Sequence, residues 1–163
     1  MKTEKIKDQS VYEAQKKDKN DSVKRLLADS GYSEKAIDYY LRRPHFGEIP
    51  NANIVAELTG SCGDKMKIYI DTINGMVSNA KFQVMGCAGA ITSAMAVVDL
   101  IKGNSLEFAR AIDDGKVFHN LEKVPVEKHP CIQLAVKTLH KALNSVSIVK
   151  VDDNHNIADR IVK

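Results

Sequence analysis

The chain has 163 residues, 44% of them hydrophobic, so it is long enough to bury one core without disulfide bonds. Its 24 basic and 21 acidic residues are interleaved and only 6% of residues are aromatic, which argues against nucleic-acid binding. The start lacks an apolar signal region, and no stretch reaches the roughly 18 apolar residues of a membrane helix. We therefore expect a cytoplasmic protein with neither a nucleic acid nor a membrane as partner.

Two different segments precede the predicted core. Residues 1–21 are lysine-rich and acidic with few large apolar side chains, and they predict a flexible or weakly helical charged arm. A short apolar face follows, formed by Val23, Leu26 and Leu27. Ser33 is then placed to cap a second helix that ends before Pro44. We expect residues 22–163 to form a single domain that includes these N-terminal helices.

Three segments with alternating apolar residues predict strands at about residues 53–58, 66–70 and 80–84. The pair Asn74-Gly75 between the second and the third is preferred in tight hairpin turns. The middle strand is expected to turn four side chains outward, Lys65, Lys67, Tyr69 and Asp71. The three strands therefore form an antiparallel sheet.

The pattern becomes helical after the third strand. Residues 88–101 predict a deeply buried helix, because almost every position is small or apolar, and Gly103 lies just past its end. Asn104 with Glu107 three residues later resembles a capping box for a short helix. The run Asp113-Asp114-Gly115 is expected to end that helix.

A loop is expected from there to about Lys128, and Pro130 suits the first turn of a last long helix. The apolar stripe of that helix is formed by Ile132, Val136, Leu139 and Leu143. The predicted fold class is therefore α+β, with a three-stranded antiparallel sheet covered by helices and an N-terminal helical extension.

The three cysteines stand at element boundaries in this fold. Cys62 follows the first strand, Cys87 follows the third strand, and Cys131 opens the last helix. The antiparallel order places Cys62 and Cys87 at the same end of the sheet, as neighbours. The positive end of a helix favours the thiolate form at Cys87 and Cys131. These placements suit metal or sulfur chemistry, and the alternative is that each cysteine is a small buried hydrophobic residue.

Two further groups strengthen the metal interpretation, Asp64 two residues beyond Cys62 and His129 two residues before Cys131. Sulfur with carboxylate or imidazole ligands suits iron–sulfur clusters and zinc alike, and the spacing does not separate the two. Three other histidines are assigned to the surface, His119, His140 and His155.

Three cysteine segments together resemble the IscU/NifU N-terminal scaffold family. They are residues 62–68 (CGDKMKI), 82–91 (FQVMGCAGAI) and 131–135 (CIQLA), in this order along the chain. His45-Phe46 with Pro50-Asn51 is similar to an early segment of that family, and the likeness covers about residues 45–144.

The resemblance implies a scaffold rather than an enzyme. Such a protein accepts sulfur from a cysteine desulfurase and iron from an iron donor or frataxin-like protein, builds a transient [2Fe–2S] cluster, and passes it to apo-proteins. It implies Cys62, Cys87 and Cys131 as cluster ligands and sulfur acceptors, and Asp64 as the group that keeps the cluster labile. His129 is a further candidate, although here Pro130 separates it from Cys131. Purified protein could also carry zinc.

Alternatives remain open at this stage. A zinc-containing sulfur acceptor resembling SufU is one, although SufU-like chains carry an insertion between the second and third cysteine motifs that this spacing lacks. A module in which zinc only stabilises the fold is another. Residues 124–128 (VPVEK) keep one of the two prolines of the family's chaperone-recognition segment, so an Hsp70-type partner is left open.

Overall fold

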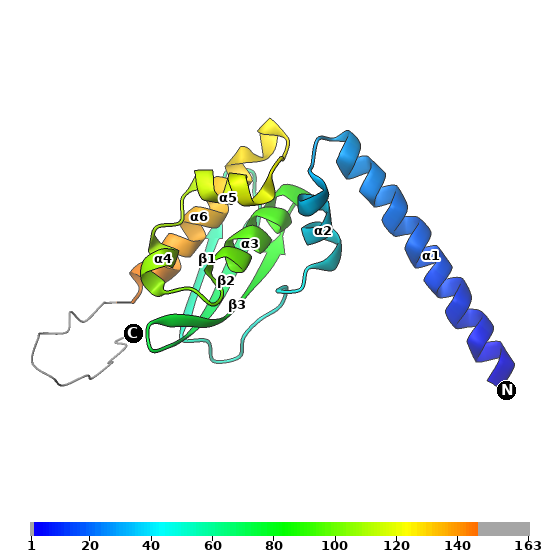
Figure 1. The fold of residues 1–163 in the computed structure, drawn as a ribbon, viewed down its shortest axis with the longest axis horizontal. Coiled ribbons are helices and arrows are strands. Elements are labelled where there is room, and N and C mark those ends of the chain that lie inside the picture. The colour runs from blue at the N-terminus through cyan, green and yellow to red at the C-terminus, as the bar shows by residue number, and fades with distance from the viewer. Residues whose placement is uncertain (1, 147–163) are drawn as a thin grey trace, which may run out of the picture.

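The computed structural model describes residues 2–146, with side chains from residue 9 onward, and its architecture is α+β as predicted (Figure 1). Three strands form one antiparallel sheet in the order β1-β2-β3, namely β1 (Ile54–Thr59), β2 (Lys65–Ile73) and β3 (Met76–Met85). The helices are α1 (Lys2–Asp29), α2 (Glu34–Arg42), α3 (Ala88–Ile101), α4 (Leu106–Arg110), α5 (Asp114–Leu121), the 3-10 turn η1 (Val126–Lys128) and α6 (His129–Asn144).

The sheet confirms the alternation seen in the sequence. Its helix-facing side carries Ile54, Met66, Ile68, Ile70 and Phe82, all buried. Asn74 and Gly75 both adopt positive φ, 51° and 74°, as the tight hairpin turn between β2 and β3 requires. Because the turn fixes the register, β3 returns to the end of the sheet where the β1–β2 loop lies.

The helices gather on one face of the sheet (Figure 1). The central helix is α3, buried along almost its whole length between the sheet, α2, α5 and α6. The predicted apolar stripe of α6 is buried against α3 and the sheet, and it comprises Ile132, Val136, Leu139 and Leu143. The predicted buried helix and the predicted last helix are both confirmed.

Helix α1 projects away from this body as a long arm (Figure 1). It spans the segment expected to be flexible or weakly helical, and the flexibility stays a prediction. Of the three residues predicted to form its apolar face, Leu27 is buried and Val23 is partly buried, but Leu26 is 66% exposed, so the apolar face is narrower than predicted. No helix within residues 2–146 is both long and apolar enough to cross a membrane.

The sheet face opposite the helices is partly covered as well. Tyr69 was expected to point to solvent, and it does lie on that face, but Ile49 and Ala52 pack over it and leave it 6% exposed. Its hydroxyl donates a hydrogen bond to Gln83 Oε1 at 2.7 Å. The predicted exposure of Tyr69 was wrong because apolar alternation indicates only which face of the sheet a residue occupies. It does not indicate whether another segment of the chain packs over that face.

The stretch after α3 differs from the prediction in two ways. The residue that caps α4 is Ser105, whose hydroxyl accepts from the Phe108 amide at 3.0 Å, so the proposed Asn104 cap was wrong by one residue. The run Asp113-Asp114-Gly115 was expected only to end the short helix, but it also begins the next one. The Asp113 side chain accepts a hydrogen bond from the Lys116 amide at 2.8 Å and caps α5. The loop predicted up to Lys128 therefore contains α5.

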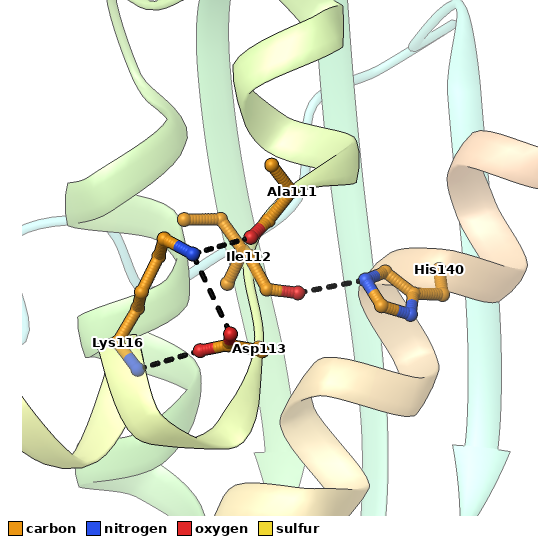
Figure 2. A network of polar contacts seen from close by, with 5 residues as sticks. All are labelled: Ala111, Ile112, Asp113, Lys116 and His140. Atoms are coloured by element: carbon orange, nitrogen blue, oxygen red, sulfur yellow. Dashed lines mark hydrogen bonds and ion pairs between the residues drawn. The ribbon is translucent and has the colours of Figure 1, made fainter.

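Figure 2 shows how this part of the chain is tied to α6. His140 Nε2 lies 2.8 Å from the Ile112 carbonyl oxygen, and Lys116 Nζ donates to the Ala111 carbonyl at 2.9 Å. His140 is therefore half-buried and structural, whereas the prediction assigned it to the surface. His119 is exposed as expected. His155 lies outside the described residues.

Candidate metal or cluster site

The candidate site lies at the end of the sheet opposite the hairpin turn. There the β1–β2 loop, the end of β3 and the start of α6 meet. The loop is closed by backbone hydrogen bonds from the Gly60 amide to the Asp64 carbonyl at 2.8 Å and from the Gly63 amide to the Gly60 carbonyl at 3.0 Å. Gly63 has φ +86°, a conformation that glycine adopts without a steric penalty. The turn therefore gives Asp64 a fixed position next to the first residue of β2.

Asp64, Cys87 and Cys131 form a compact cluster. The Cys87 thiol donates to Asp64 Oδ2 at 3.2 Å, and its Sγ lies 3.6 Å from Cys131 Sγ. One ligand atom from each of the three residues lies within 4.8 Å of the other two. We call these three residues the sulfur cluster site. Cys87 occupies the N-cap of α3 but makes no capping hydrogen bond, so its sulfur is free to face the other two groups.

Close backbone approaches hold the cluster together. A Cβ atom added at Gly86 would lie 2.6 Å from Asp64 Cγ and 2.7 Å from its Oδ1, so only glycine lets that carboxylate reach Cys87. A Cβ added at Gly89 would lie 2.9 Å from Lys128 Cδ. The Lys128 stem thus lies against the first turn of α3, and this contact brings the start of α6, with Cys131, beside Cys87.

Burial dominates the electrostatics of Cys131. Its side chain is 4% exposed, and burial raises the pKa of the thiol to about 12, assisted by the neighbouring Cys87 thiol, by Asp64 and by Cys62. The expectation that the helix start makes this thiol a thiolate was therefore wrong for the metal-free protein. The partial charge of a helix end is outweighed when the thiol is desolvated beside other acidic groups.

The structure separates the other two predicted residues from the sulfur cluster site. Cys62 is exposed, and although it lies near enough to Cys131 to raise its pKa, its sulfur is not among the three clustered ligand atoms. The prediction that Cys62 and Cys87 share one end of the sheet agrees with the strand register, but the direct sulfur contact is between Cys87 and Cys131. The His129 ring packs edge-to-face on Phe118 with centroids 5.2 Å apart.

One residue of this region escaped the sequence analysis entirely. Tyr32, at the junction of α1 and α2, is 7% exposed, and its hydroxyl is buried without a hydrogen-bond partner among the described residues. Burial is the main cause that raises the pKa of this phenol, and Cys87 and Cys131 add to it. No periodic pattern identifies it, because it stands between Gly31 and Ser33 outside any helix. Its distance of 55 residues from Cys87 hides the relation further.

The donor set fits a thiophilic metal ion or an iron–sulfur cluster. Two sulfurs and one carboxylate oxygen converge within reach of a single ion, and thiolate with one harder ligand suits zinc and iron–sulfur chemistry. Fold and site together define a small α+β domain with a sulfur-rich candidate site for a metal ion or cluster at one end of its sheet.

Comparison with known proteins agrees with this class. The sequence model of one protein family, the NifU-like N terminal domain, matches residues 31–152 of this chain. The iron–sulfur cluster assembly scaffold protein IscU of Haemophilus influenzae is 36% identical over 117 residues, covering 69% of this chain and 92% of that protein. IscU 1 of Archaeoglobus fulgidus is 33% identical over 113 residues, covering 69% and 74%. The chain therefore belongs to the NifU-like N-terminal domain family.

Solved structures show the same fold. A candidate iron–sulfur cluster assembly scaffold protein for the SUF system from Fervidobacterium islandicum AW-1 superposes with a TM-score of 0.58 at 26% identity, covering 69% of this chain and 96% of that one. The N-terminal part of a NifU-like protein from Brucella abortus gives a TM-score of 0.57 at 17% identity, covering 72% and 95%, and this likeness concerns the fold alone.

Proposed function

We propose that this protein is a scaffold on which iron–sulfur clusters are assembled. The observation that carries the proposal is the contact between Cys87 and Cys131, with sulfurs 3.6 Å apart and the Asp64 carboxylate beside them. Its relatives at 33–36% identity are named scaffold proteins, which supports the same role. The cluster, a [2Fe–2S] unit in this proposal, is cargo that the protein holds for a time and then releases.

In this proposal Cys87 and Cys131 supply two thiolates, and Cys62, whose side chain is exposed on the β1–β2 loop, supplies the third. Because Cys62 is exposed while Cys131 is 4% exposed, Cys62 is the cysteine that a sulfur-donating protein reaches most directly. The donor in this proposal is a cysteine desulfurase. Iron comes from a separate donor such as a frataxin-like protein, and the finished cluster goes to apo-proteins.

Asp64 explains how such a site can release its cargo. A carboxylate is a weaker ligand for iron–sulfur clusters than a thiolate, so it leaves one coordination position easy to exchange. Asp64 also accepts the Cys87 hydrogen bond in the metal-free protein, which keeps both groups in place before loading. His129 stays a candidate ligand, two residues from Cys131.

Anaerobic reconstitution tests the proposal. Metal-free protein is mixed with ferrous iron, cysteine, a cysteine desulfurase, and a thiol reductant that supplies electrons to convert persulfide sulfur to sulfide. We expect visible iron–sulfur absorbance in the wild type, none in Cys87→Ser or Cys131→Ser, and weaker absorbance in Cys62→Ser. Ser78→Ala, on the exposed side of β3, is the matched control and should behave as wild type. Unchanged absorbance in Cys87→Ser would contradict the proposal.

A zinc-containing sulfur acceptor is the second candidate, favoured by the structural likeness to the SUF-system protein. The same sulfur and carboxylate donors would hold zinc, and one cysteine would receive the persulfide sulfur. The reconstitution experiment separates the two functions. Persistent absence of colour, together with one tightly bound zinc per chain, favours the second candidate over the first.

A further inference from the structure

The two sulfurs of the sulfur cluster site lie in contact with each other. Cys87 Sγ is 3.6 Å from Cys131 Sγ, and both residues are free thiols. Cys62 makes no such sulfur contact within the part of the chain that the structure describes. The sulfurs of a disulfide are about 2.05 Å apart, so the two side chains need to close a gap of only about 1.5 Å to form one.

The backbone around this pair holds the two sulfurs side by side. Helices α3 and α6 pack along each other, and each carries one of the cysteines at its start. In the first turn of α3, the Gly89 carbonyl accepts hydrogen bonds from the buried hydroxyls of Ser93 at 2.6 Å and Thr92 at 3.1 Å. The Lys128 stem, which precedes α6, lies against Gly89. Both cysteines are therefore carried by braced backbone.

The two thiols differ in exposure. Cys131 is 4% exposed, whereas Cys87 is partly exposed at the N-cap of α3. A small oxidant from solvent therefore meets Cys87 first, with the Cys131 sulfur in contact behind it. A sulfenic acid formed on one cysteine condenses with a neighbouring thiol, and cysteines that respond to oxidants often stand beside such a second thiol.

We propose that hydrogen peroxide converts Cys87 and Cys131 into an intramolecular disulfide that reversibly closes the sulfur cluster site. Peroxide first transfers one oxygen to the Cys87 sulfur, giving a sulfenic acid and one water. The Cys131 sulfur then attacks the Cys87 sulfur and displaces the hydroxyl, which leaves with the Cys131 proton as a second water. Two thiols are oxidised by two electrons in all, and the two peroxide oxygens are reduced by two.

The bond itself does not depend on the proposed function, but its effect on metal binding rests on it. A disulfide sulfur is not a thiolate, so the site loses both sulfurs at once. Asp64 also loses the hydrogen bond that the Cys87 thiol donates at 3.2 Å. A dithiol reductant returns two electrons and two protons and restores both thiols. Loading of the scaffold thus stops under oxidation and resumes after reduction.

Peptide mapping tests the bond directly. The full metal-free chain is treated with hydrogen peroxide, remaining thiols are alkylated, and the protein is digested and analysed by mass spectrometry without reduction. Trypsin places Cys87 in residues 82–102, Cys131 in residues 129–137 and Cys62 in a third peptide. We expect peptides 82–102 and 129–137 to be linked to each other in the main product.

Two variants separate the steps. Cys62→Ser keeps both members of the pair and should form the same linkage as wild type. Cys131→Ser removes the thiol that resolves the sulfenic acid, so a dimedone probe should then label Cys87. Circular dichroism of each reduced variant checks that it is folded, and the linkage in wild type requires no variant at all.

Cobalt(II) tests the effect on the site because it occupies zinc-type thiolate sites and gives a sulfur-to-metal charge-transfer band. The band is recorded in wild type before oxidation, after oxidation and removal of peroxide, and after reduction and removal of the reductant. We expect the band to fall in proportion to the disulfide formed and to return after reduction.

Three results would overturn the inference. The first is a wild-type protein in which Cys87 is oxidised to sulfinic acid without any linkage, and the second is a main linkage that involves Cys62, within or between chains. The third is a full charge-transfer band in protein that carries the bond. A reduced wild type that forms the linkage on oxidation but never gives a thiolate band would support the disulfide and contradict the proposed function alone.

Discussion

The two ends of the sheet use polar groups in opposite ways. At the hairpin end, polar side chains are bound to backbone groups: His140 lies 2.8 Å from the Ile112 carbonyl, and Arg110 donates to the carbonyls of Leu143 and Val146 (Figure 2 shows part of this end). At the cysteine end, the sulfur cluster site brings acidic groups against one another, joined by a weak hydrogen bond from Cys87 to Asp64 and a 3.6 Å contact between the sulfurs of Cys87 and Cys131. Polar groups at one end stabilise the fold, and those at the other form the candidate metal or cluster site.

The largest change in stability is expected from a substitution in the hydrophobic core that both ends of the sheet share. Leu139 is fully buried in α6, and Leu139→Ala should lower the free energy of unfolding by about 2–5 kcal/mol through lost burial and a cavity. Chemical denaturation measures this. The folded fraction should keep the cobalt(II) charge-transfer band of the wild type. A changed band would show that stability and ligand binding are not separable along this helix.

The second prediction concerns a substitution that perturbs only the cysteine end of the sheet. Gly86→Ala places a methyl group against the Asp64 carboxylate and should displace it, weakening cobalt(II) binding about 10- to 100-fold, as the loss of a supporting contact does. Competition with a chelator measures the affinity. Gly115→Ala is the matched control: it lies in α5, where alanine favours the helix, and should leave the affinity unchanged. Equal affinities in the two variants would contradict the role given to Gly86.

The third prediction concerns pH at the cysteine end. Because the pKa of Cys131 is raised to about 12, this thiol is protonated at neutral pH and must lose its proton when it binds metal. Metal affinity should therefore rise with pH, by about tenfold per unit from this group alone. Chelator competition at three values between about pH 6.5 and pH 8.5 measures the slope. A flat profile would mean that Cys131 is not a ligand.

The smallest effect is expected at the hairpin end. His140→Ala removes the contact with the Ile112 carbonyl and should lower the free energy of unfolding by about 1 kcal/mol. Thermal or chemical unfolding measures the change, and cobalt(II) affinity should not move. A loss of affinity in this variant would show that the two ends are coupled through α6.

Much of the fold was predictable because its signals are local. The hairpin follows from Asn74-Gly75, and the buried strands and helices follow from apolar periodicity. Helix α5 was missed because Asp113 and Gly115 are common in turns, and only the hydrogen bond from the Lys116 amide identifies Asp113 as a cap. Tyr69 was misplaced because the residues that cover it, Ile49 and Ala52, precede the strand and carry no pattern of their own.

The residues of the candidate site could be selected from the sequence, but their arrangement could not be predicted as well. The sequence identified the three cysteines and Asp64, and strand order placed Cys62 near Cys87. The contact of Cys131 with Cys87 was harder to predict from the sequence, because it depends on how α6 packs against α3. Periodicity shows only which face of a helix is apolar. The burial of Tyr32 could not be predicted, because it exists only after the α1–α2 junction meets the segment before α6.

X-ray absorption of the zinc-loaded protein tests the central claim, that Asp64, Cys87 and Cys131 form one metal or cluster site. The account predicts at least two sulfur ligands at about 2.3 Å together with at least one oxygen or nitrogen ligand at about 2.0–2.2 Å. Cys87→Ser should show one sulfur fewer. Zinc bound by oxygen and nitrogen alone, or a sulfur count that is the same in wild type, Cys87→Ser and Cys131→Ser, would contradict it.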